Sequence, residues 1–113
     1  MERRKDNRLT TYAKVVELQN KKIGYLHDIN NNGFKIGFIE KTNFKQDEEI
    51  EIVIIPEAEL NLSFFKTHVV IKWEEWDGVF CNVGCKISKI SEENKEKLDK
   101  LEIYFNSIEN DDY

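Results

Sequence analysis

Short runs in which apolar and polar residues alternate make up much of the chain. A two-residue repeat points successive side chains to opposite faces of a strand, so each run predicts a strand with one face toward a core. In the third run, for example, Phe34, Ile36 and Phe38 share one face. The predicted strands span residues 12–18, 23–29, 34–38, 49–55, 62–76 and 79–87. Turn-forming residues separate several of them, among them Asn30 to Gly33, and Asp77 with Gly78.

About six strands at this spacing, with no helix between them, are typical of an antiparallel barrel or sandwich. The period changes only near the C-terminus, where Ser91 is a candidate helix N-cap. After it, apolar residues recur at helical spacing, at Leu98, Leu101, Phe105 and Ile108. We therefore expect a mainly β protein with one C-terminal helix that lies over one mouth of the barrel.

Two tryptophans, Trp73 and Trp76, lie three residues apart on the fifth predicted strand. On a regular strand an odd spacing places two side chains on opposite faces. We assign Trp73 to the core, and Trp76 to the outer surface as a candidate contact for a partner protein.

The length of 113 residues suits one domain, and a content of 40% hydrophobic and 35% charged residues is typical of a folded chain. No apolar run approaches the roughly 18 residues of a membrane span. The N-terminus shows no apolar segment of a secretory signal. We therefore expect a cytoplasmic protein that does not insert into a membrane.

The net charge of −5 is unevenly distributed. Residues 1–22 carry seven Lys and Arg against three acidic residues, whereas the remainder carries 10 basic and 19 acidic residues. An acidic body lacks the positive face that long duplex DNA or single-stranded nucleic acid requires. A basic N-terminal segment instead suits a small anion that the segment can clasp.

Few residues suit catalysis or metal binding. Cys81 and Cys85 lie four apart without nearby Cys or His partners, so we expect two reduced cysteines that pack as small hydrophobic side chains. His27 and His68 each stand alone in the sequence. No nucleophile–base pair, metal-ligand cluster or glycine-rich phosphate loop is recognisable. We expect neither an enzyme nor a bound metal or cofactor.

Two motifs carry the candidate ligand chemistry. Arg4 and Arg8 form R-x-x-x-R in the basic segment, and an arginine fork grips phosphate or the O6/N7 edge of guanine. Asp28 and Asn30, at the end of the second predicted strand, project from one face, where a carboxylate can accept hydrogen bonds from guanine N1 and N2. Gly33 then lets the backbone turn sharply or approach a base closely.

In order and spacing, these motifs resemble those of the PilZ domain, a bacterial family of cyclic di-GMP receptors. The family's marks are R-x-x-x-R in an N-terminal arm and [D/N]-x-S-x-x-G at the end of the second strand. The segments Val69–Trp73 (VVIKW) and Val83–Ile87 (VGCKI) are similar to later strands of the family. The resemblance covers roughly residues 3–105.

The resemblance implies a six-stranded antiparallel β-barrel with a C-terminal α-helix. It divides the chain into a flexible basic arm, residues 1–10, and a single barrel-and-helix domain, residues 11–113. Single-domain members of the family act as adaptors, in which cyclic di-GMP orders the arm and changes the surface shown to a protein partner. The ligand-binding residues that it implies are Arg4, Arg8, Asp28, Asn30 and Gly33, with Arg3 as a further candidate.

Asn30 stands where the family usually has serine, and this keeps a second interpretation open. The chain would then be a degenerate PilZ-like domain that no longer binds the dinucleotide and acts only through protein–protein contacts. In that case Arg4 and Arg8 belong to a solvated arm, and residues 28–33 form an ordinary turn.

Overall fold

The structure, a computed structural model, describes residues 13–29 and 32–110, with side chains as far as residue 107. Outside the described residues lie the predicted arm and four of the predicted ligand contacts, Arg3, Arg4, Arg8 and Asn30. Within them, the chain forms β1 (Lys14–Glu17), β2 (Lys22–Ile29), β3 (Gly33–Phe38), β4 (Glu49–Ile55), the 3-10 helix η1 (Ala58–Leu60), β5 (Phe65–Trp76), β6 (Cys81–Lys89) and the helix α2 (Glu92–Asn110).

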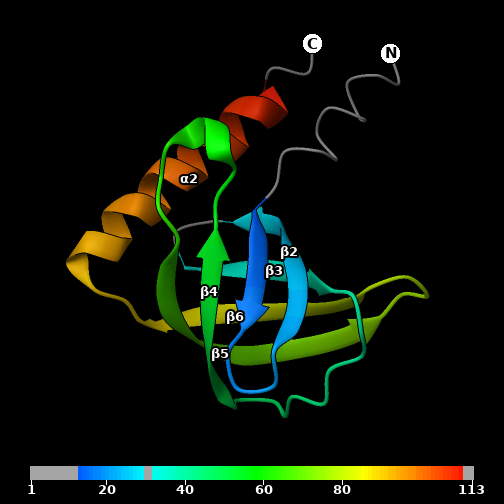
Figure 1. Cartoon of the computed structure of the whole chain (residues 1–113). Helices are drawn as coiled ribbons and strands as arrows, with labels where there is room; N and C mark the ends of the chain where they lie inside the picture. The colour runs from blue at the N-terminus through cyan, green and yellow to red at the C-terminus, as the bar shows by residue number, and fades with distance from the viewer. Residues whose placement is uncertain (1–12, 30–31, 111–113) are drawn as a thin grey trace, which may run out of the picture.

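The strands close into a barrel in the order β1, β2, β3, β6, β5, β4, and every neighbouring pair is antiparallel (Figure 1). Closure pairs β1 with β4, so the barrel has no open sheet edge in the described part of the chain. The predicted fold class, a six-stranded antiparallel barrel with a C-terminal helix, is confirmed.

The predicted strand bounds agree with the structure to within a few residues, and β4 matches its prediction. The largest difference is at β5, which begins at Phe65 instead of residue 62. The reason lies just before it, where Asn61, the residue that caps the C-terminal end of η1, has a left-handed backbone (φ 59°). The Asn61 amide donates to the carbonyl of Ala58 (3.0 Å), so these residues turn instead of extending the strand.

Buried side chains from all six strands fill the barrel. The three residues predicted to share a face, Phe34, Ile36 and Phe38, are all among them, at 5%, 0% and 0% exposure. The predicted position of the two cysteines in this core is also confirmed, because Cys81 and Cys85 are free thiols and buried.

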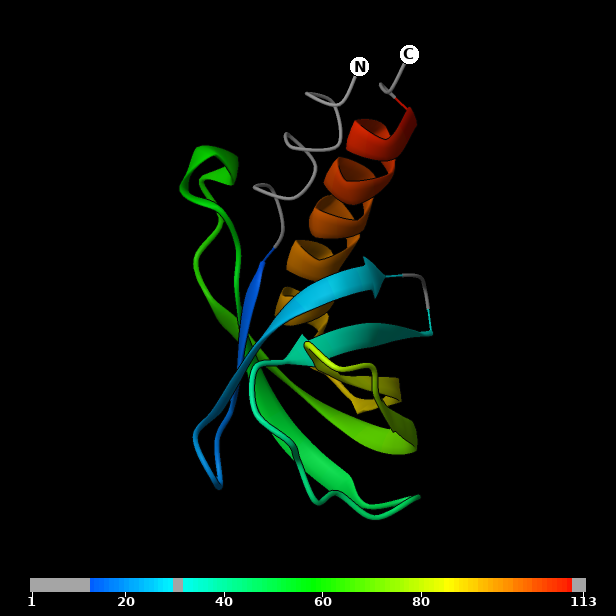
Figure 2. The same ribbon diagram turned by 90° about the vertical axis from the view of Figure 1, so that its right-hand side faces the viewer.

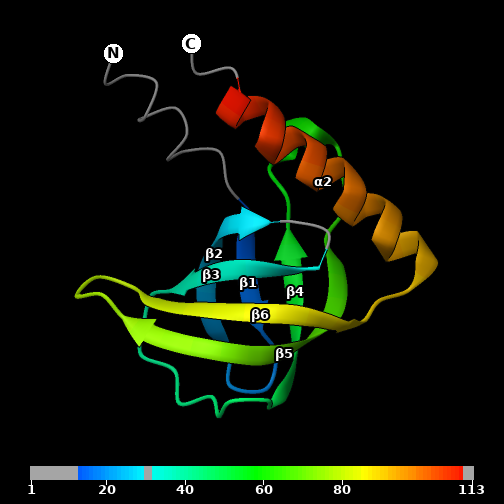
Figure 3. The same cartoon turned by 180° about the vertical axis from the view of Figure 1, so that it is seen from behind.

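The helix α2 lies at the end of the barrel where β2 and β4 finish (Figures 2 and 3). Its first turn is capped as predicted, since the Ser91 hydroxyl accepts a hydrogen bond from the Asn94 amide (3.1 Å). Leu98 and Leu101 are buried and join the barrel core, with Phe105 packed against it. In the described part of the chain, no helix is both long enough and apolar enough to cross a membrane.

The assignment of Trp73 to the core is wrong, and a β-bulge explains why. Ile71 pairs with Cys85, whereas Trp73 pairs with Gly84, so β5 carries one extra residue between the two pairs. Val69 and Ile71 face the core, and the extra residue reverses the alternation after them. Trp73 therefore lies on the outer surface, with 45% of the residue exposed.

Candidate functional site

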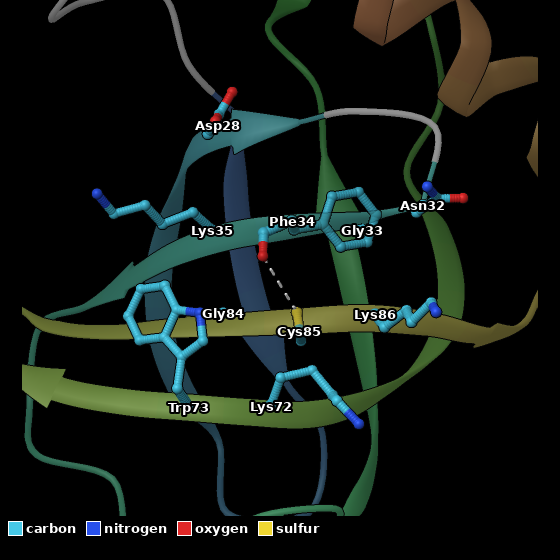
Figure 4. A pocket seen from close by; sticks show the side chains of 10 residues that line it. All are labelled: Asp28, Asn32, Gly33, Phe34, Lys35, Lys72, Trp73, Gly84, Cys85 and Lys86. Atoms are coloured by element: carbon cyan, nitrogen blue, oxygen red, sulfur yellow. Dashed lines mark hydrogen bonds between the residues drawn. The ribbon is translucent and has the colours of Figure 1, made fainter.

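Asp28 and Gly33, the two predicted ligand contacts among the described residues, line one surface cavity (Figure 4). The cavity has a volume of about 290 Å³ and lies over β2, β3, β6 and β5. Its lining residues are Asp28, Asn32, Gly33, Phe34, Lys35, Lys72, Trp73, Gly84, Cys85 and Lys86. The structure thus brings Asp28 and Gly33, the described part of the second predicted motif, to a hollow that also holds residues from two other strands, β5 and β6.

The indole of Trp73 forms one wall of this cavity. It lies against Gly84 of the neighbouring strand, and a Cβ atom at residue 84 would overlap the ring. Glycine is therefore required here for close approach, although its backbone is not in the left-handed region. The indole is held against β6 while part of it stays open to solvent.

Lysines surround the rest of the opening. Lys35, Lys72 and Lys86 line the cavity against the single carboxylate of Asp28, so the lining has a net positive charge. Lys72 also forms an exposed ion pair with Asp47 (Nζ to Oδ1, 3.1 Å). The chain as a whole carries a net charge of −5, so the positive charge of this lining is a local feature. A local excess of cations favours an anionic ligand at this place.

Asp28 is exposed at the end of β2, where its Oδ1 accepts a hydrogen bond from the Ile29 amide (2.8 Å). It stands opposite Lys35 in the β2–β3 register. The register shifts between Leu26 and Asp28, which is a second irregularity beside the cavity. Bulges re-aim side chains, and here two of them, in β2 and β5, lie on opposite sides of the cavity.

The glycine at residue 33 has a structural reason of its own. A Cβ atom there would collide with the carbonyl oxygen of Cys85 on β6. Gly33 is therefore needed for the close approach of β3 to β6, whether or not a ligand binds. Its predicted role in approaching a base is a separate matter and remains a prediction.

The cysteine at the floor of the cavity is not suited to act as a nucleophile. The Cys85 thiol donates a weak hydrogen bond to the Phe34 carbonyl (3.7 Å), and burial raises the pKa of this thiol to about 12. It therefore stays protonated at neutral pH. No cluster of three metal-ligating side chains occurs among the residues that the structure describes.

The described chain begins close to the cavity. The carbonyl of Ala13 accepts a hydrogen bond from the Leu26 amide (2.9 Å), and Leu26 precedes Asp28 by two residues on β2. The basic segment that holds Arg4 and Arg8 joins the barrel at this point.

A second cavity, of about 360 Å³, lies beside the start of α2 and is less suited to an anion. Two of its basic groups face one carboxylate, since Lys66 Nζ lies 3.6 Å and His68 Nε2 lies 4.0 Å from Glu51 Oε2. Of the predicted ligand contacts that the structure describes, Asp28 and Gly33, neither lines it. We therefore take the cavity beside Trp73 as the candidate site.

Sequence reasoning missed the residues of this site that best suit a base and an anion, namely Trp73 and the lysines at 35, 72 and 86. The only sequence signal for Trp73 is that the alternation of Val69 and Ile71 breaks off there, since Trp73 stands among the charged residues Lys72, Glu74 and Glu75. Such a break is compatible with a bulge but does not locate it. The lysines are ordinary surface residues in the sequence, and only strand pairing brings them together.

Comparison with known proteins agrees on the fold. No protein-family model matches the chain, and no curated protein sequence matches it. Among solved structures, it is similar in fold to another protein that contains a barrel of this kind. That protein is the Bacillus subtilis inhibitor of motility (MotI/DgrA), with a TM-score of 0.67 and 14% sequence identity. The match covers 86% of this chain and 46% of the other, so this chain spans about half of its length.

Proposed function

We propose that this chain is a receptor for cyclic di-GMP and that the dinucleotide binds in the cavity beside Trp73. One observation carries the proposal: Asp28 and Gly33 of the PilZ-like motif line the same cavity as an exposed indole and three lysines. The barrel with its C-terminal helix agrees with the fold that the motif implies. The fold likeness to an inhibitor of motility is compatible with a regulatory role.

The chemistry of the cavity suits each part of such a ligand. A guanine base can stack on Trp73, and stacking of a base on an aromatic side chain contributes roughly 1–3 kcal/mol. Lys35 and Lys86 line the cavity, and their ammonium groups would supply counter-charges to the two phosphates. The Asp28 carboxylate accepts hydrogen bonds, and guanine N1 and N2 donate them, whereas adenine lacks this pair of donors.

The arm completes the site in this proposal. Arg8 precedes Ala13 by five residues, so the extended chain between them reaches at most about 18 Å. Ala13 is bonded next to the β2 segment that ends in the cavity, which supports an arm that closes over the bound ligand. Arg4 and Arg8 would hold phosphate and guanine, with Arg3 as a further contact and Asn30 bonding to guanine.

The function is binding and signalling, without catalysis. The ligand orders the arm over the barrel in the cytoplasm, and the changed surface is recognised by a protein partner while the barrel stays nearly rigid.

The alternative function, a degenerate domain that does not bind the ligand, can be tested at Asn30. Asn30→Ser restores the side chain that is usual in the family, and we expect it to bind cyclic di-GMP at least as tightly as the unchanged protein.

Nuclear magnetic resonance of the labelled chain tests the site directly. On titration with cyclic di-GMP, we expect the largest shifts at the Trp73 indole N–H and at the amides of Asp28 and Gly33. Residues of the second cavity, such as Thr67, serve as the internal control and should shift little. Shifts confined to the second cavity would show that the ligand binds there and not beside Trp73. The absence of shifts in both the unchanged protein and Asn30→Ser would favour the degenerate domain.

A further inference from the structure

The hairpin between β5 and β6 carries exposed apolar side chains away from the cavity and from α2. It projects beyond the barrel wall (Figures 1 and 3). We refer to residues 74–80 as the hairpin tip. Within it, 44% of Trp76 and 68% of Val79 are exposed. Large apolar residues on a protruding turn are costly to expose to water, which suggests that another surface covers them.

Side-chain hydrogen bonds and a ring contact brace the hairpin tip. The Asp77 carboxylate accepts hydrogen bonds from the amides of Val79 and Phe80 and from Asn82 Nδ2, each at 2.8 Å. At the base of the turn, the Phe80 ring packs edge-on against His27, with centroids 5.0 Å apart. Because these contacts form within the chain itself, they restrict the turn without a partner and reduce the conformational entropy lost on association.

The charge of the hairpin tip selects the kind of surface that fits it. The tip holds three acidic residues, Glu74, Glu75 and Asp77, and no basic residue. The Trp76 ring already attracts a cation, since the Lys41 ammonium lies 5.5 Å from the ring centroid. A basic surface therefore meets both a negative field and an aromatic ring that favours cations.

We propose that the hairpin tip docks into a partner protein, in an apolar pocket that takes Val79 and Trp76 and has a rim of Lys or Arg facing Glu75. A second copy of this chain is a poor occupant, because two acidic tips repel each other and the body carries a net negative charge. The surface is separate from the cavity beside Trp73, so the inference does not depend on the identity of the ligand.

Site-specific photo-crosslinking of the full chain in the cells that make it tests the inference. A photoreactive phenylalanine analogue replaces Val79 or, as a matched control of equal exposure (68%) on α2, Ile103. Mass spectrometry then maps the segment of any captured protein that is bonded to residue 79. We expect an adduct specific to residue 79 whose mapped segment has more Lys and Arg than Asp and Glu.

Capture alone does not support the inference, so a charge variant accompanies it. Glu75→Lys, which reverses an exposed charge on the tip, should lower the adduct yield at least five-fold without changing the unfolding temperature. The inference is overturned if residue 79 yields no adduct beyond that of residue 103, or if the adduct is a second copy of this chain. It is also overturned if the mapped segment is acidic or if Glu75→Lys leaves the yield unchanged.

Discussion

The indole of Trp73 lies against Gly84, with no room for a Cβ atom between ring and backbone. This contact holds an aromatic side chain beside a cavity that is lined by Asp28 and three lysines. The contact depends on the bulge in β5, without which Trp73 would face the core. In the proposed function, this ring is the surface on which a guanine base stacks.

Trp73→Ala should therefore weaken cyclic di-GMP binding by roughly 1–3 kcal/mol, the contribution of one stacked base. Trp73→Phe keeps an aromatic surface and should lose less. Calorimetric titration measures both. The matched control is Trp76→Ala, because Trp76 is exposed to nearly the same extent (44% against 45%) but lies outside the cavity. Equal losses in Trp73→Ala and Trp76→Ala would argue against stacking at residue 73.

Gly33→Ala separates a structural role from a ligand role. The added Cβ meets the Cys85 carbonyl, so β3 and β6 must move apart. Overpacking of this kind costs about 1–3 kcal/mol, and the free energy of unfolding should fall by that amount without any ligand. Urea denaturation measures it. Lys35→Ala is the contrasting variant, because loss of this exposed lysine should lower affinity and leave stability nearly unchanged. An unchanged stability of Gly33→Ala would contradict the steric argument.

The barrel and the helix were predictable because their signals are local and repeated. Alternation placed Phe34, Ile36 and Phe38 in the core, and the Ser91 cap marked the start of the helix. The position of Trp73 was not predictable, because a bulge depends on how two strands pair and not on the residues of one strand. The lysine cluster was hidden for the same reason, since its members are far apart in the sequence.

The motif residues themselves were predicted only in part. Asp28 and Gly33 do share a cavity, but the structure also shows that Gly33 is required by the contact with Cys85. A sequence pattern cannot separate these two reasons for a glycine. Arg3, Arg4, Arg8 and Asn30 lie outside the described residues, so their roles stay predictions.

Asp28→Ala distinguishes a direct contact with guanine from simple electrostatics. Removal of a carboxylate beside an anionic ligand should raise affinity by Coulomb's law alone. If Asp28 instead accepts hydrogen bonds from guanine N1 and N2, its loss should lower affinity for cyclic di-GMP by about 1.5–3 kcal/mol. Glu75→Ala, an exposed acid outside the cavity, controls for the charge change. A gain of affinity in Asp28→Ala would rule out the contact.

The turn of the hairpin tip should keep its shape over a wide pH range. Hydrogen bonds from Phe80, Val79 and Asn82 lower the pKa of Asp77 from 3.8 to about 2. The charged carboxylate thus stabilises the turn above pH 3.8, and this contribution is lost as the pH falls toward 2. The carboxyl carbon signal of Asp77 in a magnetic resonance titration should have its midpoint near 2. A midpoint near 4 would show that the three hydrogen bonds are weak in solution.

Calorimetric titration of the purified chain with cyclic di-GMP, with cyclic di-AMP and GTP as controls, tests the central claim most directly. We expect saturable binding of cyclic di-GMP and far weaker binding of both controls. Arg4→Ala and Arg8→Ala should each weaken the binding by about 1.5–3 kcal/mol, the scale of a charge-assisted hydrogen bond, and leave the unfolding temperature of the free protein unchanged. No heat of binding with cyclic di-GMP, or unchanged affinity in the double variant, would contradict the claim.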